Sequence, residues 1–198
     1  MAEAKVLSGA GLRGQIAGQT ALCTVGKTGA GLTYRGYDVR ELAAECDFEE
    51  VAYLLFYGEL PNTQQLTDYK SRLKPWRDLP QALKEVLERI PASAHPMDVM
   101  RTGSSVLGTL EPELSFDQQR DVAERLMAAF PAIMCYWYRF THDGVRINCT
   151  SDEETLGGHF LALLHDKKPS DFMPSTSSTL RPSRPASAPQ RCRISILA

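Results

Sequence analysis

Four histidines are the residues of this sequence best suited to acid–base chemistry: His95, His142, His159 and His165. His95 precedes a proline at an expected helix start, and His142 lies in the turn-like run 141–144, so capping and turn roles are favoured over catalysis. His159 follows two glycines on an amphipathic segment. His165 lies near the end of that segment, where the helix dipole would favour a protonated imidazole without any functional purpose. All four histidines therefore favour structural interpretations.

The carboxylate, serine and glycine motifs give no stronger signal. Asp98 could pair with His95, but a helix N-terminus commonly holds both residue types for capping. The sequence has no nucleophile elbow around a serine, no H-E-x-x-H pair and no Walker loop. Gly9, Gly11 and Gly14 fit G-x-G-x-x-G, yet no strand precedes them and no apolar helix follows, which favours a flexible entry segment.

The cysteines favour neither a metal site nor a disulfide framework. The five of them form no C-x-x-C pair and are odd in number: Cys23, Cys46, Cys135, Cys149 and Cys192. We interpret them as reduced thiols. No run approaches the roughly 20 apolar residues that a membrane span needs, and the chain does not open on a signal-peptide pattern. We therefore expect a cytoplasmic protein with no membrane partner.

The elements that would position these residues are mostly helical. Residues 20–25 and 32–34 flank a glycine-rich run and predict a small N-terminal β-hairpin. Apolar residues fall at helical spacing from Asp38 onward, and they predict helices over 47–58, 63–75, 80–91, 96–106, 117–140 and 151–165. The sequence thus predicts an all-α fold with one β-hairpin.

Several local features refine these helices. Asp47 and Ser151 each begin a capping-box pattern, and Thr63 is expected to cap the helix that it opens. Pro131 should bend helix 117–140. The run 136–138, Tyr-Trp-Tyr, points in several directions and is typical of a buried helix. The core side of that helix is expected to carry Val122, Leu126, Phe130, Ile133, Trp137 and Phe140.

Net charge and amino-acid composition both change near residue 171. Residues 172–198 contain four arginines and no acid, so removing those arginines from the 22 basic residues leaves 18 against 24 acids, a net charge of −6 for residues 1–171. The net negative charge of residues 1–171 argues against nucleic acid as a partner. Residues 172–198 also hold four prolines and six serines, a composition that predicts disorder.

Six segments together resemble bacterial 2-methylcitrate synthases, a branch of the citrate synthase family. The resemblance covers about residues 5–171, and its segments are 20–27 (TALCTVGK), 34–38 (YRGYD), 48–52 (FEEVA), 95–103 (HPMDVMRTG), 136–138 (YWY) and 157–160 (GGHF). The second and fourth also resemble citrate synthases in general. The fifth and sixth favour the methylcitrate branch.

The resemblance implies a mainly helical subunit with a large and a small domain, which forms a homodimer and condenses propionyl-CoA with oxaloacetate. An aspartate would remove a proton α to the thioester, one histidine would help the enol or enolate form, and another would polarise the ketone. No cofactor is implied, because the acyl-CoA is a substrate.

The motifs that carry those groups in the family, H-G-G-A-N and G-F-G-H-P-V-Y, do not occur in this sequence. The resemblance therefore implies that residues 1–171 are the N-terminal part of an incomplete large domain with no catalytic residue, and it predicts an inactive chain. The resemblance also implies one substrate-binding residue, Arg72. The favoured alternative is that Arg72 belongs to a basic helix face exposed to solvent. Residues 172–198 are interpreted as an out-of-frame translation of the family's next segment, around E-H-E-F-N.

Two other interpretations stay open. The chain could derive from a citrate synthase that uses acetyl-CoA. It could instead be a non-catalytic helical module that pairs with an intact homologue. Helices such as 117–140 are also expected to expose apolar faces meant for missing helices, which predicts marginal solubility or self-association of the chain.

Overall fold

The N-terminal β-hairpin that the sequence predicts is present, and a further strand extends it. The computed structural model describes residues 18–25 and 31–167. Strands β1 (Cys23–Val25), β2 (Leu32–Tyr34) and β3 (Tyr37–Asp38) form an antiparallel sheet in that order, with Cys23 opposite Tyr34. Arg35 and Gly36 both have positive φ, 51° and 90°, as a two-residue hairpin turn requires. The third strand was missed because it has only two residues.

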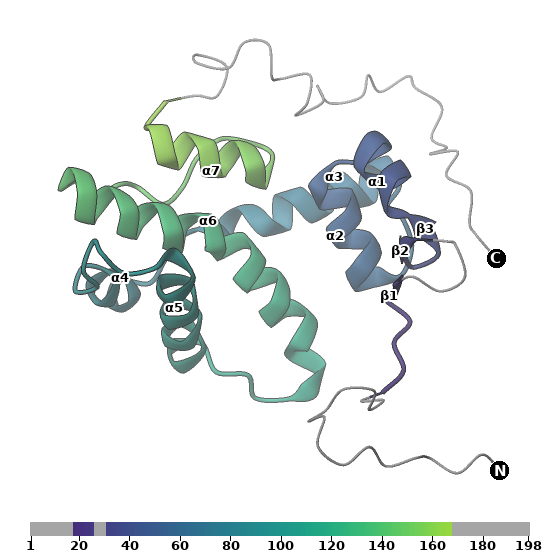
Figure 1. Cartoon of the computed structure of the whole chain (residues 1–198), viewed down its shortest axis with the longest axis horizontal. Helices are drawn as coiled ribbons and strands as arrows, with labels where there is room; N and C mark the ends of the chain where they lie inside the picture. Colours follow the sequence, from purple (N-terminus) through teal and green to yellow (C-terminus); the bar gives the residue numbers. More distant parts are fainter. Residues whose placement is uncertain (1–17, 26–30, 168–198) are drawn as a thin grey trace.

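Helices make up most of the rest of the described chain (Figure 1). They are α1 (Val39–Glu45), α2 (Phe48–Tyr57), α3 (Thr63–Leu73), the 3₁₀ turn η1 (Lys74–Arg77), α4 (Gln81–Leu87), α5 (Pro96–Leu110), the 3₁₀ turn η2 (Phe116–Gln118), α6 (Gln119–Asp143) and α7 (Leu156–His165). The predicted all-α class is confirmed. None of the described helices is long and apolar enough to span a membrane.

The helix caps of α2 and α5 agree with the sequence, whereas those of α3 and α7 correct it. Asp47 and Glu50 form the expected capping box, and α2 ends at Gly58 with φ 90°. The cap of α3 is Asn62 rather than Thr63, because Asn62 Oδ1 accepts from the Gln65 amide at 2.9 Å.

The capping box predicted at the start of α7 is wrong. Thr155 caps this helix, because its Oγ1 accepts from the Gly158 amide at 3.0 Å. Ser151 instead bonds Nδ1 of His159 at 2.9 Å. The hydroxyl thus serves a buried side chain instead of the helix backbone.

Helix α6 runs through the middle of the helical layer, with α7 on one side and α4 and α5 on the other (Figure 1). It contains Pro131 and changes direction along its length, as the sequence predicts. The predicted core side is only partly right, since Ile133 and Trp137 are buried but Phe130 is 40% exposed. The most buried stripe carries small residues, which let neighbouring helices approach on both sides: Ala128, Ala129 and Ala132.

Gly103 of α5 packs tightly against Ile133 of α6. A Cβ atom at Gly103 would lie 2.6 Å from Cγ2 of Ile133, which is fully buried. We expect Gly103→Ala to lower the free energy of unfolding by about 2 kcal/mol through overpacking. Gly108, on the same helix, has no atom within 4 Å of that position, so Gly108→Ala should be neutral or stabilise by up to about 1 kcal/mol. Urea unfolding of both variants tests this, and equal effects would contradict it.

Residues 1–17, 26–30 and 168–198 lie outside the described part of the chain. The glycine motif at Gly9, Gly11 and Gly14, the predicted disorder of 172–198 and their out-of-frame origin concern those residues. All three stay predictions.

Candidate functional site

Arg72, the one predicted substrate-binding residue, lies in a cluster where α2, α3 and α6 meet. Its guanidinium donates to Glu124 of α6 and to the hydroxyl of Tyr57 on α2. Its central carbon lies 5.9, 5.6 and 5.9 Å from the ring centroids of Tyr57, Tyr69 and Trp76, within range of cation–π attraction. We call these five residues the Arg72 cluster.

Glu124 is the buried member of the Arg72 cluster. Its side chain is fully buried, whereas that of Arg72 is 43% exposed. Burial raises the pKa of Glu124, while the Tyr57 hydroxyl at 2.9 Å and the charge of Arg72 lower it. A buried carboxylate needs such partners, because an unpaired charge is costly away from water. The cluster therefore holds three helices together.

The position of Arg72 leaves the substrate-binding prediction untested. Part of its side chain reaches solvent, but the guanidinium already serves the Glu124 carboxylate and the Tyr57 hydroxyl. The alternative of a solvated basic helix face describes Arg72 poorly, because its partner is buried.

Three of the histidines occupy helix termini. His95 caps α5 as predicted, with Nδ1 accepting from the Met97 amide at 3.2 Å. Asp98 pairs with Arg101 at 3.1 Å, so the possible carboxylate–imidazole pair at this terminus has other contacts. His142 lies inside the last turn of α6 rather than in a turn after it, and stacks on Tyr138 with ring centroids 4.4 Å apart. His165 is exposed in the last turn of α7.

His159 is the buried histidine. Its Nδ1 meets Ser151 Oγ, and its Nε2 is buried without a hydrogen-bond partner. Burial, together with the nearby positive charge of Arg77, lowers the pKa of His159 to about 4. The imidazole is therefore neutral at neutral pH. Because the side chain is sealed from solvent, it cannot exchange protons with a substrate in an open site.

Arg77 supports the same buried region. It is 2% exposed, and it donates to the backbone carbonyls of Glu153 and Glu154 just before α7. The carboxylate of Glu49 on α2 accepts from the Leu156 amide at 2.6 Å. These contacts fix the start of α7, and with it the position of His159.

None of the described cysteines forms a disulfide, and two of them are buried. Burial raises the pKa of Cys135 and of Cys149 to about 12, so neither thiol forms a nucleophilic thiolate at neutral pH. Among residues 18–25 and 31–167, no three His, Cys, Asp or Glu side chains gather closely enough to hold a metal ion.

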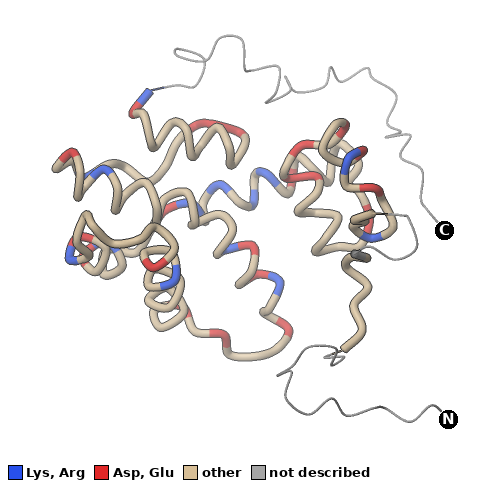
Figure 2. Tube along the Cα trace, in the orientation of Figure 1, with Lys and Arg blue, Asp and Glu red and all other residues tan. Residues whose placement is uncertain are grey.

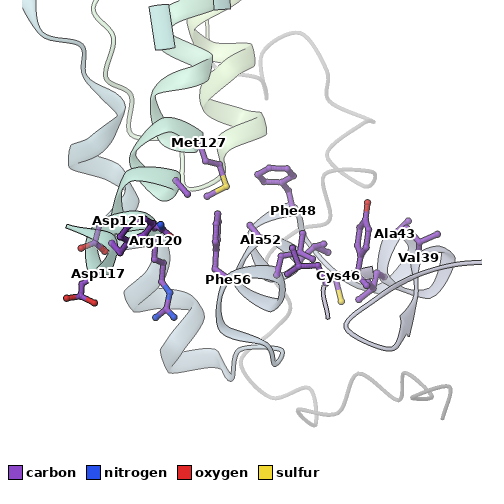
Figure 3. A pocket seen from close by; sticks show the side chains of 18 residues that line it. Val39, Ala43, Cys46, Phe48, Ala52, Phe56, Asp117, Arg120, Asp121 and Met127 are labelled. Carbon is purple, nitrogen blue, oxygen red and sulfur yellow. The ribbon is translucent and has the colours of Figure 1, made fainter. Parts of the chain in front are cut away.

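An open apolar groove lies between the β-sheet with α1 and α2 on one side and η2 with the start of α6 on the other (Figure 3). Its volume is about 1130 Å³. Phe48, Phe56 and Met127 line its middle, whereas Asp117, Arg120 and Asp121 gather at one end. Sequence reasoning missed this groove, because it joins residues far apart along the chain. Sequence reasoning also missed Glu124, because the core side expected for this helix ran through Val122, Leu126 and Phe130, and Glu124 is not among its residues.

The chain has clear relatives among known proteins. Residues 11–179 match the family model described as the C-terminal domain of citrate synthase, a match that continues past residue 171. Over 170 residues the chain is 68% identical to a 2-methylcitrate synthase of Shewanella oneidensis, which covers 86% of this chain and 45% of that protein. A citrate synthase of Mycolicibacterium smegmatis is 41% identical over 127 residues, 63% of this chain and 34% of that protein.

Solved structures agree on the fold. The crystal structure of citrate synthase from Thermotoga maritima superposes with a TM-score of 0.67 at 28% identity. The superposition covers 80% of this chain and 42% of that one. The chain thus spans less than half the length of the relatives that it matches.

Proposed function

Because the chain belongs to the citrate synthase family, whose members are acyltransferases, we propose that it forms the N-terminal portion of a 2-methylcitrate synthase. The complete enzyme would condense propionyl-CoA with oxaloacetate, yielding 2-methylcitrate and CoA. The observation that carries this proposal is the 68% identity to the S. oneidensis 2-methylcitrate synthase over 86% of the chain.

We further propose that the chain alone does not catalyse the condensation. Removing a proton α to a thioester needs a base within hydrogen-bond reach of the substrate. In the described residues, His159 is sealed in the core, His95 caps a helix, and Glu124 is committed to Arg72 and Tyr57. The role left to these residues is structural: they hold α2, α3, α6 and α7 in one arrangement.

A citrate synthase that uses acetyl-CoA is the second candidate. The M. smegmatis citrate synthase supports it, but at 41% identity over a shorter stretch than the S. oneidensis enzyme. We therefore favour propionyl-CoA as the acyl donor of the complete enzyme. By the same family resemblance we propose a homodimeric, cytoplasmic enzyme with no cofactor.

The experiment that tests the proposal is release of free CoA thiol with oxaloacetate. We expect no release by the purified chain from propionyl-CoA or acetyl-CoA. Turnover that copurifies with the chain would contradict the proposed inactivity. A stable hetero-oligomer between this chain and the intact S. oneidensis enzyme would instead favour a pairing module.

A further inference from the structure

The apolar groove exposes several large apolar side chains. Its lining includes Phe48, 60% exposed, Phe116, 85% exposed, and Leu22, 45% exposed. Phe48 lies in α2, Phe116 lies in η2, and Leu22 directly precedes β1. Apolar surface on this scale marks an interaction site or an aggregation liability.

The shape and chemistry of the groove favour a polypeptide over a small molecule. Small-molecule pockets hold about 300–1,000 Å³ and place a few polar groups to orient the ligand. This groove is open, larger, at about 1130 Å³, and its charged groups lie together at one end. One of these, Arg120, already lies 4.5 Å from the ring centroid of Tyr57. A helix with an apolar face fits such a lining.

The length of the relatives indicates where that helix comes from. This chain spans 45% of the S. oneidensis 2-methylcitrate synthase and 42% of the T. maritima citrate synthase. More than half of each relative therefore lies outside the shared part. In a folded enzyme, those residues need apolar surface on the shared part to pack against. The groove is a large apolar surface available for that packing in the described part.

Charge gives the orientation of the occupant. The connection from α5 to α6 carries the acidic residues Glu111, Glu113 and Asp117, and Asp121 follows in the first turn of α6 (Figure 2). Asp117 and Asp121 line the polar end of the groove, with Arg120 between them. A lysine or arginine on the incoming helix would be favoured at this end.

We propose that this groove is the docking surface for an amphipathic helix from the portion of the 2-methylcitrate synthase fold that lies beyond this chain. Its apolar face packs on Phe48, Phe56, Phe116 and Met127, and a basic residue lies beside Asp117 and Asp121. The proposal rests on the proposed function, because it takes the partner from that enzyme.

The test is co-expression of the tagged chain with the part of the S. oneidensis 2-methylcitrate synthase outside the matched 170 residues. We expect the two polypeptides to copurify. Phe48→Ser and Phe116→Ser should each weaken the complex at least about tenfold, since burying a phenylalanine is worth roughly 1.5–3 kcal/mol. Leu114→Ser is the matched control: Leu114 is 81% exposed, two residues before Phe116, and does not line the groove.

Binding of a hydrophobic dye to the chain alone gives a second measurement that needs no partner. Dye binding should fall in Phe48→Ser and Phe116→Ser, remain in Leu114→Ser, and fall when the S. oneidensis portion binds. Equal retention of the partner by the Phe116→Ser and Leu114→Ser variants would overturn the proposal. So would failure of the unsubstituted chain to copurify.

Two other occupants would show distinct results, and each would overturn the proposal. A second copy of the chain in the groove would give a concentration-dependent oligomer that Phe116→Ser dissolves without any partner. Residues 1–17 in the groove would make dye binding rise when they are deleted. A complex that forms but releases no thiol would instead contradict the proposed function and leave the groove assignment standing.

Discussion

Replacing Arg72 with methionine is expected to lower the free energy of unfolding by about 3 kcal/mol. The substitution leaves Glu124 fully buried without its cation, and removing one partner of a buried ion pair costs about 3–5 kcal/mol. The lower end applies, because Arg72 is partly exposed and the Tyr57 hydroxyl still donates to the carboxylate. Urea unfolding measures the change. A purely substrate-binding Arg72 would leave stability nearly unchanged.

Two further variants separate this role from a general loss of charge. Arg72→Met combined with Glu124→Leu should recover much of the loss, because the double variant removes the unpaired charge as well. Arg101 pairs with Asp98 on α5, but both side chains are mostly exposed, 77% and 58%. Arg101→Met should therefore change stability by less than about 1 kcal/mol. A loss in Arg101→Met equal to that in Arg72→Met would contradict the account.

Acid is expected to destabilise the chain through His159. Its pKa falls from the ordinary value of 6.5 to about 4 in the folded state. The unfolded chain therefore binds a proton more readily below pH 6.5. The stability from the neutral imidazole is complete above pH 6.5 and is lost as pH falls toward 4. The difference between these values is worth roughly 3 kcal/mol.

Chemical unfolding at a series of pH values tests this effect. His159→Gln should flatten the dependence between pH 6.5 and 4, whereas the unsubstituted chain should keep it. NMR titration of the unsubstituted chain measures the pKa of His159 directly, so this test does not require the variant to fold. Protonation of the His159 imidazole near pH 6.5 in the folded state would contradict the account.

The sequence carries much of the fold through local signals. Asp47, Glu50 and Gly58 mark both ends of α2, and Pro131 marks the bend in α6. Where the prediction was wrong, a tertiary contact or a nearby competitor decided the outcome. Ser151 serves the buried His159 instead of capping α7. Phe130 stays exposed because the sides of α6 that pack against neighbouring helices carry buried alanines instead.

The candidate site was less predictable from sequence. Arg72 entered through a family resemblance, which could not show that its guanidinium meets a carboxylate 52 residues away. The groove joins Phe48 to Phe116, and no periodicity relates residues at that separation. Spacing along one helix reports a face, but only packing brings faces from separate helices together.

We propose that this chain is one portion of a 2-methylcitrate synthase and lacks the groups that perform the condensation. The most direct test measures thiol release with oxaloacetate, by the chain alone and by its complex with the remaining portion of the S. oneidensis enzyme. The account predicts no release by the chain alone, and release by the complex that is faster with propionyl-CoA than with acetyl-CoA. Thiol release by the chain alone, or a stable complex that releases none, would contradict it.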